Sequence, residues 1–384
     1  MSGWKKTADI AVIGGGIVGI CTSYFLAFSG RKNIVLLEKN LLAQASTGLC
    51  VGGIRQQFSH PSNILLSQET LRRLKEISDG FRVDLGFRRV GYLFLSQEET
   101  SWKDFKLSCQ TQRRLGVPVE ILMPEEIKRR WSYIETDDLK GGTFCPEDGF
   151  ADPYSVSMAF AKGARKLGVR IHEETEVQGI RLKNGKMSGL ETTRGFLSVP
   201  AVVNAAGPWA RQVGQMVGIE LPVFPYRRQV FMTASFDALP RPVPMILDAD
   251  SLFYFRGEGP GLLLGMSDPH EPSSFHTHTD RSFMEKVGLT AVRRAPVLEK
   301  ARIQRGWAGL YSITPDENPI IGGLPGVEGF YAAVGFSGHG FQHGPSVGRI
   351  LSELILDGKT SFDLFPFRLD RFSHPHEPGE KRVI

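Results

Sequence analysis

Three glycines near the start of the chain have the spacing of a dinucleotide-binding loop. Gly14, Gly16 and Gly19 follow the β-branched run 8–13 and precede an apolar helical pattern that extends to about residue 28. The first glycine permits a tight turn, the second lets the backbone approach a pyrophosphate, and the third lets the helix pack on the strand. Glu38 ends the next apolar strand, nineteen residues after Gly19, where a carboxylate would bind the adenosine ribose. The loop predicts a bound dinucleotide and leaves NAD and FAD open.

A second glycine-rich stretch, VGFSGHGFQHGPSVGRI at 334–350, contains two histidines that would be candidate bases. We interpret its glycines as the informative residues, because Gly338 and Gly340 would let backbone lie against a bound group. Proline fits best in the first turn of a helix, so Pro345 predicts a helix that begins close to it. The amides of that helix start would supply the positive end of the site, and His339 a ring contact.

The bulk composition argues against nucleic-acid and metal binding. The net charge is +5 and the pI near 9.0, but basic residues are scattered, and the dense cluster 128–130 has acidic neighbours. The four cysteines have no zinc-site spacing and fit free thiols in a reducing compartment, so we expect a cytoplasmic protein. His270, His276 and His278 lie in a polar, turn-rich stretch that is typical of a solvated loop. We predict no metal site.

The apolar run Ile10–Phe28 contains no charged residue and is long enough to suggest a membrane span. The glycine triplet in its middle favours a strand, a tight turn and a helix instead. We therefore predict no transmembrane segment and no cleaved targeting segment, so that contact with a membrane would require a partner.

The rest of the chain predicts an α/β fold, α+β overall, without further regular βα repeats. The apolar strand that ends at Gly207 reaches a second small-residue turn, as if the chain left the nucleotide-binding part and re-entered it. Helical patterns cover 64–77, 99–115 and 282–295, a strand covers 91–96, and residues 170–207 alternate as a β-meander with turns at 184–185 and 194–195.

Four segments together resemble the flavoprotein amine oxidoreductases of the D-amino-acid oxidase and sarcosine oxidase family. They are the glycine loop, the strand 202–207 with Pro208 and Trp209, WAGLYSITPDENPIIGG at 307–323, and the stretch 334–350. Within the family, GGIRQQF and GYLFL look like the β subunits of sarcosine oxidase and dye-linked proline dehydrogenase. QASTGLCVGGI looks like the mitochondrial FAD-dependent oxidoreductase domain protein implicated in complex I assembly, which carries cysteine where this chain has Arg55.

The resemblance implies a Rossmann-like FAD-binding domain with an interleaved substrate domain on a mixed or antiparallel sheet. It assigns 1–85, 150–225 and 300–372 to the FAD-binding domain, and 86–149 and 226–299 to the substrate domain. From its place at the end of the chain, we expect 373–384 to be a mobile tail. Arg55, Tyr254, Tyr311 and Gln342 become the expected catalytic residues, of which the two tyrosines would orient the amine or carboxylate. The expected FAD contacts are Gly14, Gly16, Ile17, Val18, Gly19, Glu38, Lys39, Ser46, Thr47, Gly53, Ile54, Arg55, Val177, Ala205, Gly207, Trp209, Gly309, Gly338, His339, Gly340, Phe341 and Gln342.

The chain departs from the pattern of monomeric sarcosine oxidases at four positions. Gly309 aligns with the cysteine that tethers their flavin, so we expect non-covalent FAD. Phe58 and Gln342 replace an arginine and a lysine that grip the substrate carboxylate, which leaves Arg55 and Arg256 as the available cations. Leu263 replaces a lysine that assists the reaction with oxygen, which favours a dehydrogenase.

The resemblance therefore implies an FAD-dependent dehydrogenase that oxidises the C–N bond of a secondary amine or amino acid, such as proline or sarcosine, by hydride transfer to flavin N5. Electrons would pass to an acceptor or a partner subunit. The alternatives are a flavoprotein that acts in assembly of a respiratory complex, and a peroxide-producing amine oxidase.

Overall fold

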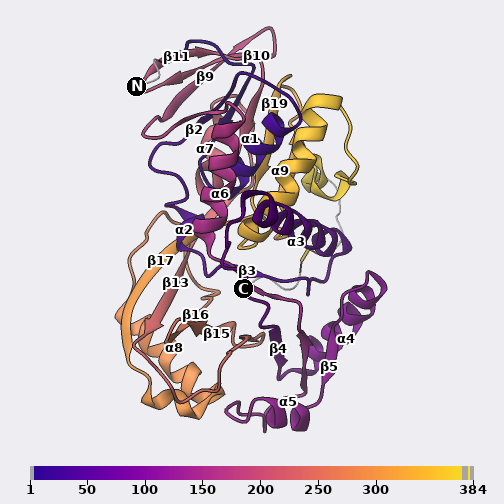
Figure 1. The fold of residues 1–384 in the computed structure, drawn as a ribbon, viewed down its shortest axis with the longest axis vertical. Helices are drawn as coiled ribbons and strands as arrows, with labels where there is room; N and C mark the ends of the chain where they lie inside the picture. The colour runs from indigo at the N-terminus through magenta and orange to yellow at the C-terminus, as the bar shows by residue number, and fades with distance from the viewer. Residues whose placement is uncertain (1–3, 374–378, 381–384) are drawn as a thin grey trace.

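The computed structural model describes residues 4–373, 379 and 380. Its ribbon has two parts that lie one above the other in Figure 1. The upper part contains a six-stranded sheet with helices against it, and the lower part contains an eight-stranded sheet.

The six-stranded sheet brings together strands that are far apart in the sequence. All its neighbours pair in parallel except the edge strand β18, which is antiparallel to β19. Its central strands are short, fully buried apolar runs, as expected for a parallel sheet that is covered on both faces. In spatial order the strands are β18 (Ile320–Gly323), β19 (Phe330–Val334), β12 (Val202–Asn204), β1 (Ile10–Ile13), β2 (Ile34–Leu37) and β8 (Arg170–His172).

The helices of the upper part begin and end at residues suited to those positions. In α3 (Pro61–Phe81) proline is the first residue and the His60 side chain accepts a hydrogen bond from the Ser62 amide, and Asp152 caps α6 (Pro153–Lys166) in the same way. α9 (Gly340–Asp357) ends at Gly358, which has the left-handed φ of 69°. The remaining helices of this part are α1 (Ile17–Phe28), α2 (Ser46–Leu49) and α7 (Ala210–Gln215).

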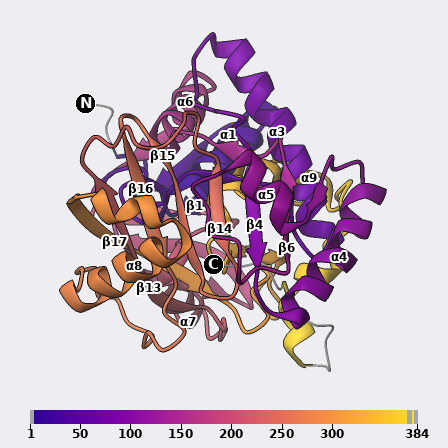
Figure 2. The same cartoon turned by 90° about the horizontal axis from the view of Figure 1, so that it is seen from below.

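The eight-stranded sheet is mixed, because β14 and β4 pair in parallel and all its other neighbours pair antiparallel. Helix α8 (Arg281–Arg294) contacts β15 and β16, whereas α4 (Glu99–Arg114) and α5 (Pro124–Arg130) contact the other end of the sheet (Figure 2). Its strands in order are β17 (Ile303–Ile313), β13 (Phe224–Thr233), β16 (Gly261–Met266), β15 (Phe253–Glu258), β14 (Met245–Asp248), β4 (Tyr92–Ser96), β6 (Gly141–Cys145) and β5 (Glu120–Leu122).

Within the described residues, two small sheets and four short 3₁₀ helices complete the fold. They are the antiparallel sheet β11 (Gly195–Ser198), β10 (Lys186–Thr192) and β9 (Val177–Lys183), the pair β3 (Gly53–Ile54) and β7 (Gly149–Phe150), and η1 (Gly207–Trp209), η2 (Pro296–Lys300), η3 (Phe365–Phe367) and η4 (Leu369–Ser373).

The predicted fold class is confirmed, including the strand–turn–helix over Ile10–Phe28 and the mixed sheet. Of the predicted segments, 1–85 supplies β1 and β2, 150–225 supplies β8 and β12, and 300–372 supplies β18 and β19 to the six-stranded sheet. The segment 300–372 also supplies β17, which pairs with β13 in the other sheet. The predicted tail, 373–384, lies outside the described residues except for residues 373, 379 and 380.

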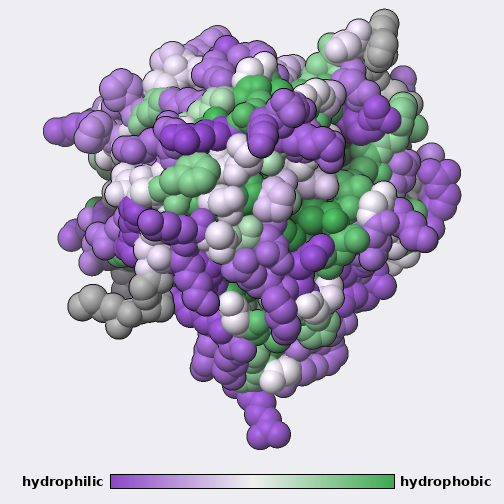
Figure 3. All heavy atoms as spheres, turned by 90° about the horizontal axis from the view of Figure 1, so that it is seen from above, coloured by the Kyte–Doolittle hydropathy of each residue, from purple (hydrophilic) through white to green (hydrophobic). Residues whose placement is uncertain are grey.

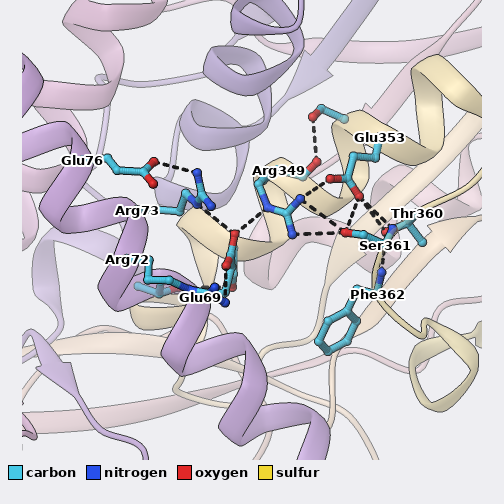
Figure 4. Close-up of polar contacts among 12 residues, drawn as sticks. Glu69, Arg72, Arg73, Glu76, Arg349, Glu353, Thr360, Ser361 and Phe362 are labelled. Carbon is cyan, nitrogen blue, oxygen red and sulfur yellow. Dashed lines mark hydrogen bonds and ion pairs between the residues drawn. The ribbon is translucent and has the colours of Figure 1, made fainter.

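An ion-pair network fastens α9 to α3 (Figure 4). The Glu69 carboxylate, almost fully buried, contacts Arg72 at 2.7 Å, Arg73 at 2.8 Å and Arg349 at 2.6 Å. Arg349 also pairs with Glu353, which accepts hydrogen bonds from the segment after α9. The network fixes the helix whose first turn lies at the candidate site.

Within residues 4–373, 379 and 380, no helix is long and apolar enough to cross a membrane. Hydrophilic side chains cover most of the face at the upper end of the molecule, and hydrophobic ones form patches toward its middle and right (Figure 3).

Cys21 is fully buried in the core, as its position in the apolar helical pattern suggests.

Candidate active site and cofactor cavity

Two of the three glycines of the first loop, Gly14 and Gly19, have different geometric requirements. Gly14 has a φ of 111°, and a Cβ there would lie 2.4 Å from the carbonyl oxygen of Ala205. A Cβ on Gly19 would lie 2.0 Å from the Gly14 carbonyl oxygen, so α1 could not pack on the loop. At the start of α1, the Ile17 amide donates to Thr47 Oγ1 at 3.1 Å. The loop therefore has the turn and the close helix contact that the spacing predicts.

Glu38 points from the end of β2 toward the glycine loop. Its carboxylate accepts hydrogen bonds from the backbone amides of Gly15 at 2.6 Å and Asn40 at 2.8 Å. The next residue, Lys39, places Nζ 3.4 Å from the centre of the Trp209 ring, and burial lowers the pKa of this lysine. The carboxylate and the cation thus flank the same cavity from one short segment.

This larger cavity, about 210 Å³ in volume, extends from the glycine loop to the start of α9. Two sequence-distant glycine turns border it, which suits an extended dinucleotide with a large group at each end. Of the predicted cofactor residues, it is lined by Gly14, Gly16, Ile17, Val18, Glu38, Lys39, Ser46, Thr47, Val177, Ala205, Gly207, Trp209, Gly338, Gly340 and Phe341.

The second glycine-rich stretch contacts this cavity through the first turn of α9. Gly338 has a φ of 96°, and a Cβ there would lie 2.3 Å from the Tyr311 ring, so glycine alone lets this ring approach. The expected helix start close to Pro345 was wrong, because α9 begins at Gly340 and the proline lies inside it. Packing explains the continued helix: a Cβ at Gly344 or Gly348 would meet α1 within 3 Å, so these glycines let the two helices pack closely.

A smaller cavity of about 80 Å³ adjoins the larger one and shares Cys50, Tyr311, Gly338 and Phe341 with it. It lies between the eight-stranded sheet, the loop at β3 and the first turn of α9. Its remaining lining residues are Val51, Gly52, Gly53, Arg55, Tyr92, Met245, Leu247, Tyr254, Ser337, His339 and Gln342. All four expected catalytic residues are therefore together at this cavity.

Arg55 and Gln342 are linked at the wall of the smaller cavity. The Arg55 backbone amide donates to Gln342 Oε1 at 2.8 Å, and the Arg55 guanidinium donates to the Gln57 carbonyl at 2.7 Å. The guanidinium carbon also lies 4.0 Å from the centre of the Phe58 ring. Because Oε1 is committed to a backbone amide, Gln342 Nε2 is the atom left for a ligand, and within the described part of the chain it has no partner.

His339 presents a neutral imidazole to the same cavity. Burial, together with the charge of Arg55, lowers its pKa to about 3, so the ring is uncharged at neutral pH. Neither ring nitrogen has a hydrogen-bond partner among the described residues. The second histidine, His343, is fully buried and its Nε2 lies 3.1 Å from Ser67 Oγ, away from the cavity. An imidazole with a pKa as low as that of His339 is a poor proton acceptor and suits hydrogen bonding.

The two predicted tyrosines reach the smaller cavity from two separate strands of the eight-stranded sheet. Tyr254 lies on β15 and Tyr311 on β17, and burial raises the pKa of both hydroxyls, which stay protonated and able to donate. Sequence reasoning missed a third, Tyr92 on β4, although it begins the strand that GYLFL predicts. Met245 and Leu247 were also missed. Their signal is the alternation along β14, which puts both on the face of Tyr92 and Tyr254.

Several predicted residues lie beside the cavities rather than on them. Gly19 supports the glycine loop, Ile54 belongs to the hydrophobic core, and Gly309 pairs with Arg228 beside Leu49. Four other residues that were expected at FAD line the smaller cavity instead: Gly53, Arg55, His339 and Gln342.

Two of the departures, Phe58 and Leu263, and the candidate cation Arg256 also have defined surroundings. Phe58 packs between the Arg55 guanidinium and the rings of His339 and His343. Arg256 donates to the Val51 carbonyl, pairs with Glu258 and covers Phe150. Leu263 is buried opposite Arg256, and the alternation of β16 puts it on the face of Gly265, which adjoins the Tyr254 hydroxyl.

Comparison with known proteins identifies the family. Residues 9–354 match the family model described as DAO, FAD dependent oxidoreductase. Human mitochondrial dimethylglycine dehydrogenase is 30% identical over 96% of this chain, which covers only 45% of that relative. The chain therefore spans about half the length of this relative. FAD-dependent oxidoreductase domain-containing protein 1 of Xenopus laevis is 32% identical over 99% of this chain and 85% of that protein.

A solved structure shows the same fold over almost the whole chain. L-proline dehydrogenase from P. horikoshii superposes with a TM-score of 0.90 at 32% identity, and the match covers 96% of this chain and 99% of that one. The family match, the whole-chain fold and the glycine-lined cavity agree with one another. The chain belongs to the DAO family of FAD-dependent oxidoreductases.

Proposed function

We propose that the chain is a dehydrogenase of small amino acids whose nitrogen carries an alkyl group, such as proline or sarcosine. The observation that carries the proposal is the smaller cavity, which Arg55 lines together with Gln342 and His339. Gln342 Nε2 and the His339 ring nitrogens have no hydrogen-bond partner among the residues that the structure describes. A guanidinium and neutral N–H groups together suit a carboxylate. Dimethylglycine and L-proline, which name two of the relatives, are both amino acids of this kind.

FAD fits the larger cavity through the glycine loop and Glu38, and when bound it supplies an acceptor for a hydride. The chain's own residues bind and orient the substrate beside it. Arg55 and Gln342 would hold the carboxylate, while Met245 and Leu247 would contact the carbon skeleton.

The same surroundings favour the reactive form of the amine. Arg55 places a positive charge at the cavity wall, and the cavity is enclosed by buried side chains, so both effects disfavour an ammonium group. Tyr254 and Tyr311 line the same cavity, where their protonated hydroxyls would orient the amine or carboxylate. Orientation and charge, rather than a general base, are the contributions expected from this site.

Leu263 supports a dehydrogenase over an oxidase. Its side chain belongs to the face that carries Tyr254, and an aliphatic group there cannot stabilise the negative charge that develops on dioxygen. Electrons would then pass to a partner subunit or a separate carrier. A cytoplasmic location stays a prediction, and the name of the human relative contains the word mitochondrial.

Anaerobic mixing of the FAD-loaded protein with matched pairs of amines tests the proposal. L-proline and sarcosine should bleach the flavin absorbance, whereas pyrrolidine and dimethylamine, which lack the carboxylate, should do so far more slowly. Equal bleaching by both members of each pair would contradict a carboxylate site. A flavin that no amine in a broad panel reduces would favour a role in assembly, and millisecond reoxidation by air would favour a peroxide-producing oxidase.

A further inference from the structure

Glu380 lies against the stretch that follows Arg55, although more than 300 residues separate the two in sequence. The Glu380 side chain is 3% exposed. Its Oε1 accepts hydrogen bonds from the Ser59 amide at 2.9 Å and the Ser59 hydroxyl at 2.6 Å. Its Oε2 accepts from the His60 amide at 3.1 Å and from Asn63 Nδ2 at 3.0 Å. Both oxygens thus accept hydrogen bonds from residues at the start of α3 and directly before it.

The backbone beside Glu380 is fixed as well. The Glu380 amide donates to the Asp316 carbonyl at 3.1 Å, and a Cβ on Gly379 would lie 2.1 Å from the same oxygen. Asp316 is itself held by an ion pair with Arg371 at 2.8 Å. The backbone of residues 379 and 380 is therefore held in place, which fixes the Glu380 carboxylate beside Ser59.

The contacts of Glu380 continue to Arg55 through Phe58. Ser59 follows Phe58 directly, and the Phe58 carbonyl accepts a hydrogen bond from Gln112 Nε2 at 2.9 Å. The Phe58 ring lies under the Arg55 guanidinium, 4.0 Å from ring centre to guanidinium carbon. The backbone that carries this ring is held on one side by Gln112 and on the other by Glu380.

We propose that Glu380 is a positioning residue for substrate binding, because through Ser59 and Phe58 it holds the Arg55 guanidinium at the smaller cavity. This inference rests on the proposed function in taking Arg55 as the partner of the substrate carboxylate. It assigns a task in amino-acid recognition to a residue far along the chain that touches neither cavity.

The donors around Glu380 require a carboxylate. Four groups of the described residues that point at its two oxygens are N–H or O–H donors. In Glu380→Gln, the amide NH₂ would replace one oxygen and face two of these donors without being able to accept from them. The substitution therefore keeps the size of the side chain and breaks about half of its contacts.

The test compares Glu380→Gln in two backgrounds. In the otherwise wild-type enzyme, KM for L-proline should rise about tenfold, which corresponds to about 1.4 kcal/mol, with a smaller change in kcat. In Arg55→Met, where no guanidinium remains to be positioned, the same substitution should change KM less than about twofold. An equal rise in both backgrounds would overturn the inference.

Two further variants control for folding. Asp370→Asn removes an exposed carboxylate from the same part of the chain, where it pairs only with Arg368 among the described residues, and should leave KM unchanged. Ser59→Ala removes one hydrogen bond to Glu380 and should raise KM about threefold even where Glu380→Gln does not fold. An unchanged KM in Ser59→Ala would then count against the inference.

Calorimetric titration with acetate separates this inference from the proposed function. Acetate should bind the FAD-loaded wild type about tenfold more tightly than Glu380→Gln, and equally weakly to both in the Arg55→Met background. If acetate behaves so while no amino acid reduces the flavin, the proposed function fails and the positioning role stands. Equal acetate affinity in wild type and Glu380→Gln would overturn the positioning role, whatever the enzyme oxidises.

Discussion

The side-chain amide of Gln342 has two separable tasks, and two substitutions distinguish them. Oε1 accepts the Arg55 backbone amide at 2.8 Å, and Nε2 faces the smaller cavity without a partner in the described structure. Gln342→Glu keeps an acceptor for the amide and removes the donor, whereas Gln342→Met removes both. The pair therefore tests substrate binding and local stability independently.

The expected magnitudes follow from these contacts. A hydrogen bond to a charged group contributes about 1.5–3 kcal/mol, which corresponds to about 10- to 150-fold in affinity. Gln342→Glu also places a negative charge beside the bound carboxylate, so KM for L-proline should rise at least about tenfold. Gln342→Met should raise KM similarly and in addition lower the free energy of unfolding by about 1–3 kcal/mol, because the buried Arg55 amide loses its acceptor.

The assay is anaerobic flavin reduction at increasing L-proline concentration, combined with denaturant unfolding of the same preparations. Gln342→Glu should unfold close to wild type while its KM rises, and Gln342→Met should be affected in both. A Gln342→Glu enzyme with wild-type KM would refute the assignment of Nε2 to the carboxylate. A Gln342→Met protein as stable as wild type would refute the role of Oε1.

Three other substitutions test separate parts of the account. Gly338→Ala should weaken FAD binding at least about tenfold in an absorbance titration, because its Cβ would meet the Tyr311 ring at 2.3 Å. The control, Gly326→Ala, has a similar φ of 82° but open space around its Cβ, and should bind FAD normally. Leu263→Lys should speed reoxidation of the reduced flavin by oxygen about tenfold in stopped-flow mixing, and an unchanged rate would count against the position assigned to residue 263. Burial raises the pKa of Asp148 from 3.8 to about 6. The folded state should therefore lose about 3 kcal/mol of stability as pH rises from about 4 to about 6, because ionisation of the buried carboxyl is unfavourable. Asp148→Asn should remove this loss, measured as melting temperature against pH.

Local sequence patterns predicted the elements that form the cofactor cavity. The glycine loop, the acid at the end of β2 and the small-residue turn after β12 each depend on neighbouring residues, and each lies where its pattern indicates. The position of Pro345 misled the prediction of the helix start, because α9 begins at Gly340 and continues through the proline, with Gly344 and Gly348 packed closely on α1.

The smaller cavity was less predictable because it forms between segments that are distant in sequence. Tyr92 and Met245 face it only because β4 and β14 pair in parallel, with these two residues in register. Likewise, nothing near Glu380 in the sequence indicates that its carboxylate would accept hydrogen bonds from the start of α3. Such contacts depend on tertiary structure. The family resemblance nevertheless identified Arg55, Tyr254, Tyr311 and Gln342, which all line the smaller cavity.

The most direct test of the central claim is an anaerobic single-turnover measurement. The FAD-loaded chain is mixed with L-proline or sarcosine, unlabelled or deuterated at every carbon bonded to nitrogen, and loss of the flavin absorbance is followed in time. If the chain oxidises the C–N bond of such amino acids, the absorbance is lost without oxygen, and the deuterated substrate reacts several-fold more slowly. Absorbance that persists with every amino acid, or is lost equally fast with the deuterated substrates, would contradict the account.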